Sequence, residues 1–413
     1  MGSAFADGSW LSERRIRAVA LLCGAATLLS LAWLFATAHG TLDDWGRPLG
    51  TDFSDVWAAG RMALDGHAAD AWNWRLHYAA QQSAHGSADV PFYGWHYPPP
   101  FLLVAALLAT LPYTAALVVW EGATLGAAAL ALRGIVGGRR ALLVGLCAPV
   151  VLVCLMHGQN GFLTAALMAG GLLLIERRPF AAGLLLGCLV YKPQFAVVVG
   201  PLLLARGEWR AVAGAACSAA ALVALTFALW GWGVWQAFFD SLPLTRHVVI
   251  EAGATGWAKI QSPFGWARMW GAGLGSAYAV QAAATLAAVA AVVWLTRTAA
   301  PSVRNAAAAA AALLSTPYLL DYDLVLLGLG AAFLVRDGLD RGFLPFEKSL
   351  VALVWIAPLC ARQAGALAGL PLGQLTVIAL FVLAIRRACV LDGAAAALLR
   401  ASPFRRSHEA SAR

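Results

Sequence analysis

Charged residues are scarce in this sequence. Asp, Glu, Lys and Arg make up 12% of its 413 residues, and hydrophobic residues make up 61%, whereas soluble domains carry about 25% charged residues. A water-soluble core cannot absorb that much apolar surface. Because backbone groups in lipid must hydrogen-bond within their own segment, the composition predicts an all-α, multi-pass integral membrane protein.

Cysteine patterns and common cofactor motifs are also missing. The seven cysteines are an odd number and lie in or beside apolar runs, without the spacing of a disulfide framework or a zinc site. The sequence contains no P-loop, dinucleotide-binding glycine fingerprint, metal motif or nucleophile elbow. We therefore expect neither a cofactor nor a bound metal.

The net charge of +8 raises the question of a nucleic-acid partner. The basic residues form short clusters between apolar runs rather than one patch, which the positive-inside rule explains better. The predicted partner is the lipid bilayer, and no nucleic acid is expected.

Long apolar runs are abundant. A crossing helix needs about 20 apolar residues, and the runs 18–36, 117–132, 162–175, 211–230 and 277–295 approach that length. Together with the shorter runs they predict about 11 to 13 transmembrane helices in a single domain over residues 1–413. The first run is longer than the apolar region of a signal peptide, so we interpret it as a retained helix.

Alternation of the basic clusters predicts the topology. Both termini lie inside, and two polar segments, 41–97 and 231–263, lie outside. Residues 99–111 form a short apolar run that lies at the outer interface or re-enters, and does not cross. Within the first outer segment, 55–64 and 68–81 have helical periodicity and aromatic residues suited to the membrane interface.

Asp52 and Asp55 follow the first helix at a spacing of three, which places both carboxylates on one face if the next helix begins at Thr51. Two interpretations stay open for Asp52. Asp52 or Thr51 caps the next helix, or Asp52 is an accessible general base at the membrane surface.

Polar residues interrupt apolar runs at two further places. His96 and Tyr97 precede three prolines, where they can meet a substrate at the outer surface, and His157, Gln159 and Asn160 separate two apolar runs. Polar groups at membrane depth are costly and usually face a cavity. These residues are therefore candidates for substrate binding.

Lys192 is one of only three lysines in the sequence, and it lies between two apolar runs that are each too short to span a bilayer. A cation in such a recess can meet a phosphate as a point charge. The alternative is a lysine that reaches the outer interface. Tyr191 and Gln194 flank it.

Asp321, Tyr322 and Asp323 lie at a late outer turn, where the carboxylates contact sugar hydroxyls or cap the next helix. Lys259 and Arg268 add cations to the second outer segment.

The order of these motifs resembles glycosyltransferase family 87, the multi-pass transferases of GT-C fold that use polyprenyl phosphate sugars. The shared elements are Asp-Phe after the first helix, Tyr-Pro-Pro some 45 residues later, Gly-Gln-Asn, Lys-Pro-Gln and a late Tyr-Asp. They extend from about Asp52 to Leu327.

The resemblance implies an inverting sugar transfer at the outer face of the bacterial plasma membrane, from a polyprenyl phosphate sugar to a hydroxyl of a glycan or glycolipid acceptor. It implies Asp52 as the base and Lys192, Tyr191 and Gln194 near the donor phosphate. Asp55, His96, Tyr97, His157, Gln159, Asn160, Lys259, Arg268, Asp321, Tyr322 and Asp323 are the expected substrate-binding residues. Related mannosyltransferases often have histidines at the Asp321–Asp323 position. The resemblance therefore does not imply that the transferred sugar is mannose.

Two other classes of protein place polar residues in broken helices. A transporter or flippase often shows inverted repeats and a midplane site, whereas this sequence has no convincing repeat and its polar motifs fall at outer turns. A membrane acyltransferase is the other class, but no His-Asp motif of the expected kind is present.

Overall fold

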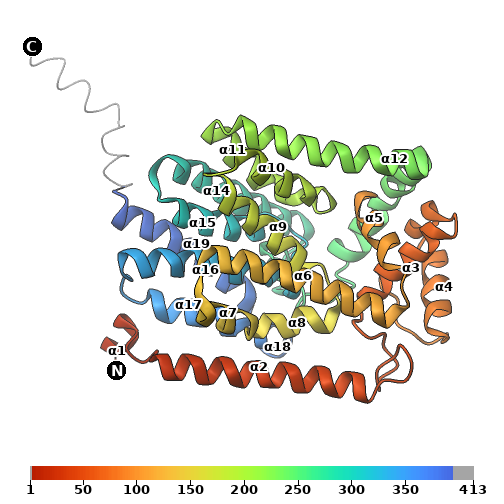
Figure 1. Cartoon of the computed structure of the whole chain (residues 1–413), viewed down its shortest axis with the longest axis horizontal. Coiled ribbons are helices and arrows are strands. Elements are labelled where there is room, and N and C mark those ends of the chain that lie inside the picture. Colours follow the sequence, from red (N-terminus) through yellow and green to blue (C-terminus); the bar gives the residue numbers. More distant parts are fainter. Residues whose placement is uncertain (1, 394–413) are drawn as a thin grey trace, which may run out of the picture.

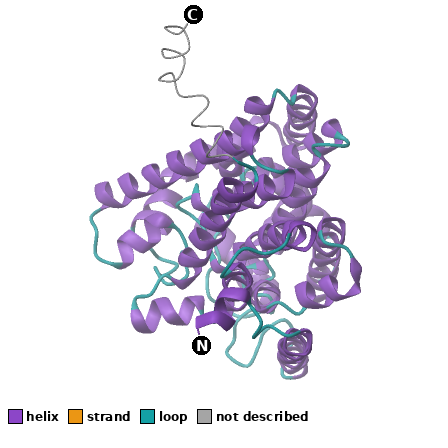
Figure 2. Ribbon diagram, turned by 90° about the vertical axis from the view of Figure 1, so that its left-hand side faces the viewer, coloured by secondary structure: helices purple, strands orange, loops and turns teal. Residues whose placement is uncertain are grey.

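The computed structural model describes residues 2–393. Within that range the chain folds into helices and contains no strand, only isolated bridges such as the one between Ile260 and Leu320 (Figure 2). The all-α prediction is confirmed. The C-terminal end, which we expected inside, falls beyond the described residues.

Five helices are long and apolar enough to cross a membrane: α2 (Glu13–Ala36), α6 (Tyr113–Ile135), α12 (Trp209–Thr245), α14 (Leu274–Thr298) and α19 (Leu372–Leu391). Two bent pairs raise the number to seven. These are α7 (Gly138–Leu146) with α8 (Pro149–His157), bent by 51°, and α17 (Glu347–Ile356) with α18 (Ala361–Ala368), bent by 74°. The chain is a multi-pass membrane protein. A count of 11 to 13 also requires shorter apolar helices to cross, and it stays a prediction.

The remaining helices are shorter. They are α1 (Gly2–Asp7), α3 (Phe53–Leu64), α4 (Trp74–His85), α5 (Pro100–Leu108), α9 (Gly161–Leu174), α10 (Pro179–Gly187), α11 (Ala196–Arg206), α13 (Pro263–Met269), α15 (Pro301–Leu314) and α16 (Val325–Arg341).

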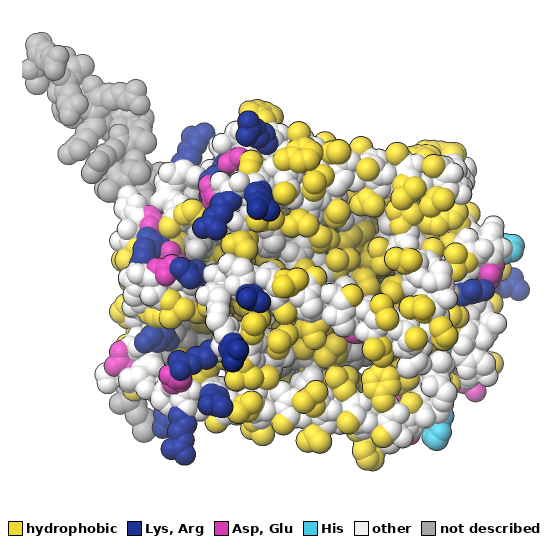
Figure 3. All heavy atoms as spheres, viewed as in Figure 1, with side chains coloured by type: hydrophobic (Ala, Val, Ile, Leu, Met, Phe, Trp, Pro, Cys, Tyr) yellow, Lys and Arg dark blue, Asp and Glu magenta, His cyan; other side chains and the backbone are white. Residues whose placement is uncertain are grey.

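Charges are distributed unevenly along the long axis of the molecule. In Figure 3 most acidic and basic side chains gather at the end that holds α1 and α17 in Figure 1, and an apolar belt covers the middle. The helices α2 and α12 run along this axis at opposite edges (Figure 1). Side chains of α2 such as Leu28 and Leu29 are about 70% exposed, so the belt is the surface that meets lipid.

The opposite end of the molecule holds α3, α4 and α5 (Figure 1). Nine residues give α5 a length of about 14 Å, too short for a hydrocarbon layer of about 30 Å. It packs against α3 instead, where Gly60 lies so close that an added Cβ would stand 2.1 Å from the Ala105 carbonyl oxygen. This geometry agrees with the expectation that 99–111 does not cross.

The two helices that we expected at the membrane interface differ from the prediction in two ways. Nine of the twelve residues of α3 are buried, so protein rather than lipid covers this helix. The predicted start of the helix over 68–81 is wrong. A 3₁₀ turn occupies Ala68–Trp72, and α4 begins only at Trp74. The Asn73 side chain accepts hydrogen bonds from the backbone of Arg75 and Leu76, which caps α4 and forces the break.

Candidate active site

The segment before α3 positions the two aspartates. Gly50 and Thr51 have φ values of 69° and 28°, and the left-handed region is unfavourable for a β-branched threonine. Gly158 packs against this turn so closely that a Cβ there would lie 2.7 Å from the Gly50 carbonyl oxygen. Backbone strain of this kind persists where surrounding structure fixes it, often at functional sites. The contact brings Asp52 beside the Gly-Gln-Asn turn.

The Asp52 carboxylate contacts residues outside the helix that it precedes. Its Oδ2 accepts a hydrogen bond of 3.1 Å from Gln159 Nε2 and lies 3.5 Å from Lys259 Nζ. No side-chain bond caps α3, so the capping interpretation is wrong. Burial by itself raises the pKa of Asp52, but Lys259, His157 and the Gln159 hydrogen bond outweigh it and hold the pKa below the ordinary value. These neighbours therefore favour the ionised form of Asp52.

Asp55 lies in the opposite electrostatic situation. Its Oδ1 is buried and has no hydrogen-bond partner among the described residues. Burial, and then the charge of Asp52, raise the pKa of Asp55 well above its usual range. Two carboxyl groups whose pKa values are shifted in opposite directions are suited to different roles. Asp52 is the one suited to accept a proton.

The Gly-Gln-Asn turn connects Asp52 to Tyr97. The Tyr97 hydroxyl donates to Gln159 Oε1 at 3.0 Å, and the same oxygen accepts from the Asn160 backbone at 3.1 Å. Both side-chain polar atoms of Asn160 are buried without a partner in the described chain. An unpaired buried amide is costly, so Asn160 is available to a ligand. His96 lies beside Thr245 Oγ1 at 3.2 Å, and burial lowers the pKa of its imidazole to about 4.

Lys192 is buried rather than extended toward lipid. Its Nζ lies 2.5 Å from Asp323 Oδ1, and both side chains are less than 10% exposed. The alternative interpretation, in which the Lys192 side chain reaches the outer interface, is therefore wrong. Both lysines lie near the Tyr322 ring, with Lys192 Nζ 5.9 Å and Lys259 Nζ 5.5 Å from its centre.

The depth of Lys192 follows from the helices on either side. Helix α10 and the following 3₁₀ turn contain 13 residues between Pro179 and Tyr191, a rise of about 20 Å. The chain then returns through α11 to Arg206, which pairs with Glu176 at 3.0 Å near the start of α10. The turn at Lys192 therefore ends inside the protein. Tyr191 bonds Thr164 Oγ1 through its hydroxyl at 2.7 Å and stacks on Phe101.

A third ion pair comes from a residue that the sequence analysis missed. Arg362 on α18 pairs with Asp321 Oδ2 at 2.6 Å, and its Nη2 lies 3.0 Å from His157 Nε2. His157 Nδ1 lies 2.7 Å from the Val153 carbonyl oxygen. Since a carbonyl only accepts, Nδ1 carries the proton and Nε2 accepts from Arg362. The sequence did contain a signal for Arg362, because an arginine inside an apolar stretch is a candidate functional residue.

Two predicted site residues lie apart from this cluster. Gln194 is partly buried, and its side chain makes no hydrogen bond within the described residues. Arg268 stacks on Trp257 and bonds the carbonyls of Ala272 and Glu251, so it holds the loop before α14.

Three carboxylate–cation pairs thus surround Tyr322: Asp52–Lys259, Asp323–Lys192 and Asp321–Arg362. They join segments that are far apart in the sequence. Buried, convergent ionisable groups mark a functional-site candidate in a membrane protein.

The fold and this cluster define a polytopic membrane protein with a buried polar site in its interior. Comparison with known protein families gives the class a name. The sequence model of glycosyltransferase family 87 matches residues 95–320, which is more than half of the chain. The chain belongs to glycosyltransferase family 87. No curated protein and no solved structure matches it. The matched range includes Lys192 and Lys259, whereas Asp52 precedes it and Asp323 follows it.

Proposed function

We propose that this glycosyltransferase moves a sugar with inversion from a polyprenyl phosphate donor to an acceptor hydroxyl, at the outer face of a bacterial plasma membrane. The observation that carries the proposal is Asp52, a buried carboxylate that caps no helix and lies within reach of Gln159 and Lys259. A glycosyl phosphate already has a good leaving group. The protein therefore needs mainly a base and cations, and the cluster provides both.

In the proposed reaction, Asp52 removes the proton of the acceptor hydroxyl. The acceptor oxygen attacks the anomeric carbon from the face opposite the phosphate, and the bond from that carbon to the phosphate oxygen breaks. The electron pair leaves with the phosphate, so the products are an inverted glycoside and a polyprenyl phosphate. No nucleotide or metal enters this scheme.

Lys192 is the proposed cation for the departing phosphate. Its ammonium is already paired with Asp323 at 2.5 Å, so phosphate binding requires the ammonium to be shared between the two anions. Lysine suits this because its compact ammonium has three donors on a flexible stem. Tyr191 and Gln194 flank the same turn and are proposed near the phosphate. The proposed substrate-binding residues are Asp55, His96, Tyr97, His157, Gln159, Asn160, Lys259, Asp321, Tyr322 and Asp323.

The proposed orientation rests on the distribution of charge. Lys and Arg gather at the end that holds α1 and α17 (Figures 1 and 3), and basic residues favour the cytoplasmic side. The opposite end, with α3, α4 and α5, then faces the periplasm or exterior. Asp52 directly precedes α3, so the base lies toward that side. The acceptor is proposed to be a glycan or glycolipid.

Sugar transfer by the purified full chain in lipid tests this function. Radiolabelled polyprenyl phosphate sugars are supplied with glycan acceptors, and we expect label in a product that lipid extraction does not remove. A chain that moves the labelled lipid between leaflets without forming a new glycosidic bond would be a flippase, and the proposal would fail. Nucleotide sugars given alone should yield no product.

A further inference from the structure

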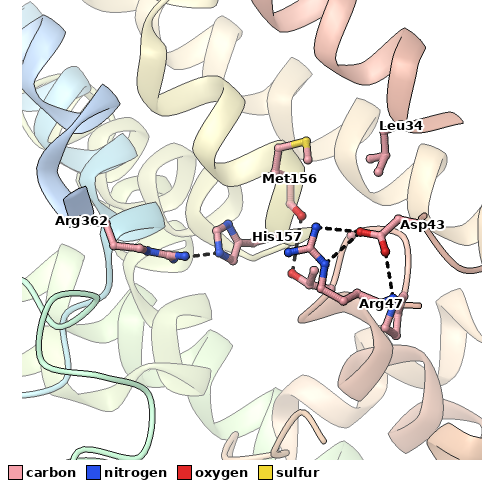
Figure 4. Close-up of a pocket in the computed structure, with 9 residues that line it drawn as sticks. Leu34, Asp43, Arg47, Met156, His157 and Arg362 are labelled. Atoms are coloured by element: carbon pink, nitrogen blue, oxygen red, sulfur yellow. Dashed lines mark hydrogen bonds and ion pairs between the residues drawn. The ribbon is translucent and has the colours of Figure 1, made fainter. Parts of the chain in front are cut away.

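A polar cavity adjoins the cluster described above and shares His157 and Arg362 with it. It has a volume of about 110 Å³ and is lined by Leu34, Asp43, Arg47, Pro48, Gly50, Thr51, Met156, His157 and Arg362. Gly50 and Thr51 immediately precede Asp52, whereas Lys192 is absent from the lining. Figure 4 shows His157 between Arg362 and Arg47. Two guanidinium groups thus face one small space next to the proposed base.

Each of these arginines is held by a carboxylate behind it. Arg47 pairs with Asp43 at 2.8 Å, and Arg362 pairs with Asp321 at 2.6 Å. Both carboxylates are less than 5% exposed, whereas about 40% of each arginine side chain is exposed. The buried anions fix the planes of the guanidinium groups, and both cations line the cavity together with the Asp43 carboxylate.

Hydrogen-bond donors remain free on both arginines. Arg47 uses Nε and Nη2 on Asp43, and Arg362 uses Nε and Nη2 on Asp321 and His157. Nη1 of each residue has no acceptor within the described part of the chain. A guanidinium presents donors in a planar fork that matches phosphate. The free atoms are therefore suited to a phosphate oxygen.

The cavity lies against a lipid-facing helix. Leu34 belongs to α2, and its neighbour Trp33 is 63% exposed. Arg362 is the second residue of α18, next to the 74° bend of the α17–α18 pair. A phosphate attached to a lipid chain can therefore reach the arginines from the membrane while its tail remains in the bilayer.

We propose that this cavity binds the phosphate group of a lipid through Arg47 and Arg362, as a site separate from Lys192. The lipid is either the polyprenyl phosphate carrier or a phospholipid of the bilayer. Assignment to the carrier rests on the proposed function, whereas binding of a lipid phosphate does not.

Binding to the full chain in phosphatidylcholine nanodiscs tests the proposal. The probe is a short radiolabelled polyprenyl phosphate. The competitors are the same polyprenyl phosphate without label, the polyprenol of equal length, phosphatidate and inorganic phosphate. We expect saturable binding that polyprenol and inorganic phosphate do not displace. Displacement by polyprenyl phosphate alone identifies the carrier as the ligand, and equal displacement by phosphatidate identifies a general lipid phosphate site.

The variants Arg47→Gln and Arg362→Gln should each weaken binding at least tenfold. Arg61→Gln is the matched control, because Arg61 also pairs with an aspartate four residues away and has the same 42% side-chain exposure as Arg47. Arg362→Gln leaves Asp321 unpaired, so Arg362→Gln with Asp321→Asn is measured as well.

Unchanged affinity in the Arg47→Gln and Arg362→Gln variants, or loss only in Lys192→Ala, would overturn the proposal. Lipid phosphate binding without any sugar transfer would contradict the proposed function but would still support this binding site.

Discussion

At the scale of single residues, the two aspartates before and inside α3 show how position decides chemistry. They have the same side chain and lie three residues apart, yet the environment lowers the pKa of Asp52 and raises that of Asp55. Lys259, His157 and the Gln159 hydrogen bond lower the pKa of Asp52, whereas burial and the charge of Asp52 raise that of Asp55. Asparagine substitutions at the two positions should therefore behave differently.

Asp52→Asn should reduce sugar transfer by about 10² to 10⁴, the usual value of a positioned general base. Asp55→Asn is the matched control and should retain far more activity, because burial and the charge of Asp52 already favour the neutral form of the Asp55 carboxyl group. Initial rates of both purified variants, with donor binding measured in parallel, provide the comparison. Near-parental transfer by Asp52→Asn would mean that the base lies elsewhere, with Asp55 and Asp323 next to examine.

Asp55 should also make folding stability depend on pH. A group whose folded pKa is raised stabilises the fold fully below its unfolded pKa of about 4, and that stabilisation disappears as the pH rises through the folded pKa. The melting temperature of the parent should therefore fall, relative to Asp55→Asn, as the pH rises from about 4 toward neutrality. Thermal melts in detergent measure this difference. Parallel curves for the two proteins would show that Asp55 titrates normally.

Substitution of Lys192 should affect donor use. A hydrogen bond to a charged group is worth about 1.5 to 3 kcal/mol, so removal of the ammonium should raise the donor KM by roughly 10- to 100-fold. Lys192→Ala alone leaves Asp323 buried and unpaired, which costs about 3 to 5 kcal/mol of stability. Lys192→Met with Asp323→Asn removes both charges and avoids that loss. Lys192→Arg should retain part of the donor use. An unchanged donor KM in the folded double variant would remove Lys192 from the phosphate site.

At the scale of helices, close approach depends on residues without bulk. Gly183 on α10 lies so near α12 that an added Cβ would stand 2.0 Å from the Ala211 carbonyl oxygen, and residues 306–312 of α15 are alanines that are fully buried. Small residues allow backbones to approach where no hydrophobic force drives association in lipid. The alanine and glycine content therefore serves packing at these helices.

Gly60→Val should destabilise the contact between α3 and α5. The Ala105 carbonyl oxygen would lie 2.1 Å from the new Cβ, and backbone cannot yield as a side chain can. Overpacking typically costs about 1 to 3 kcal/mol, and the displaced α3 should also reduce transfer through Asp52. Gly122→Ala on α6 is the control, since nothing lies within 4 Å of its added Cβ. Equal melting temperatures for the two variants would contradict the tight contact.

At the scale of the whole molecule, the unequal charge of the two ends leads to a prediction of orientation. In a cysteine-free background, single cysteines at Ala88 and Ala254 should react with an impermeant thiol reagent added to intact cells, because both positions are exposed and lie in the expected outer segments. A cysteine at Arg139, in an expected inner cluster, should react only after permeabilisation. Protection of Ala88 and Ala254 together with labelling at Arg139 would reverse the orientation.

The sequence by itself determined the helical membrane fold, because few charges and long apolar runs leave a chain no other way to satisfy its backbone in lipid. It also singled out most of the polar cluster, since each ionisable residue at membrane depth stands out from its surroundings. Tertiary structure decided the rest. Neither spacing nor periodicity pairs Asp52 with Lys259, 207 residues away, or Lys192 with Asp323, 131 residues away. Arg362 shows the same limit, because its importance comes from Asp321 and His157, which only the packing of α8 and α18 around the Tyr322 turn brings within reach.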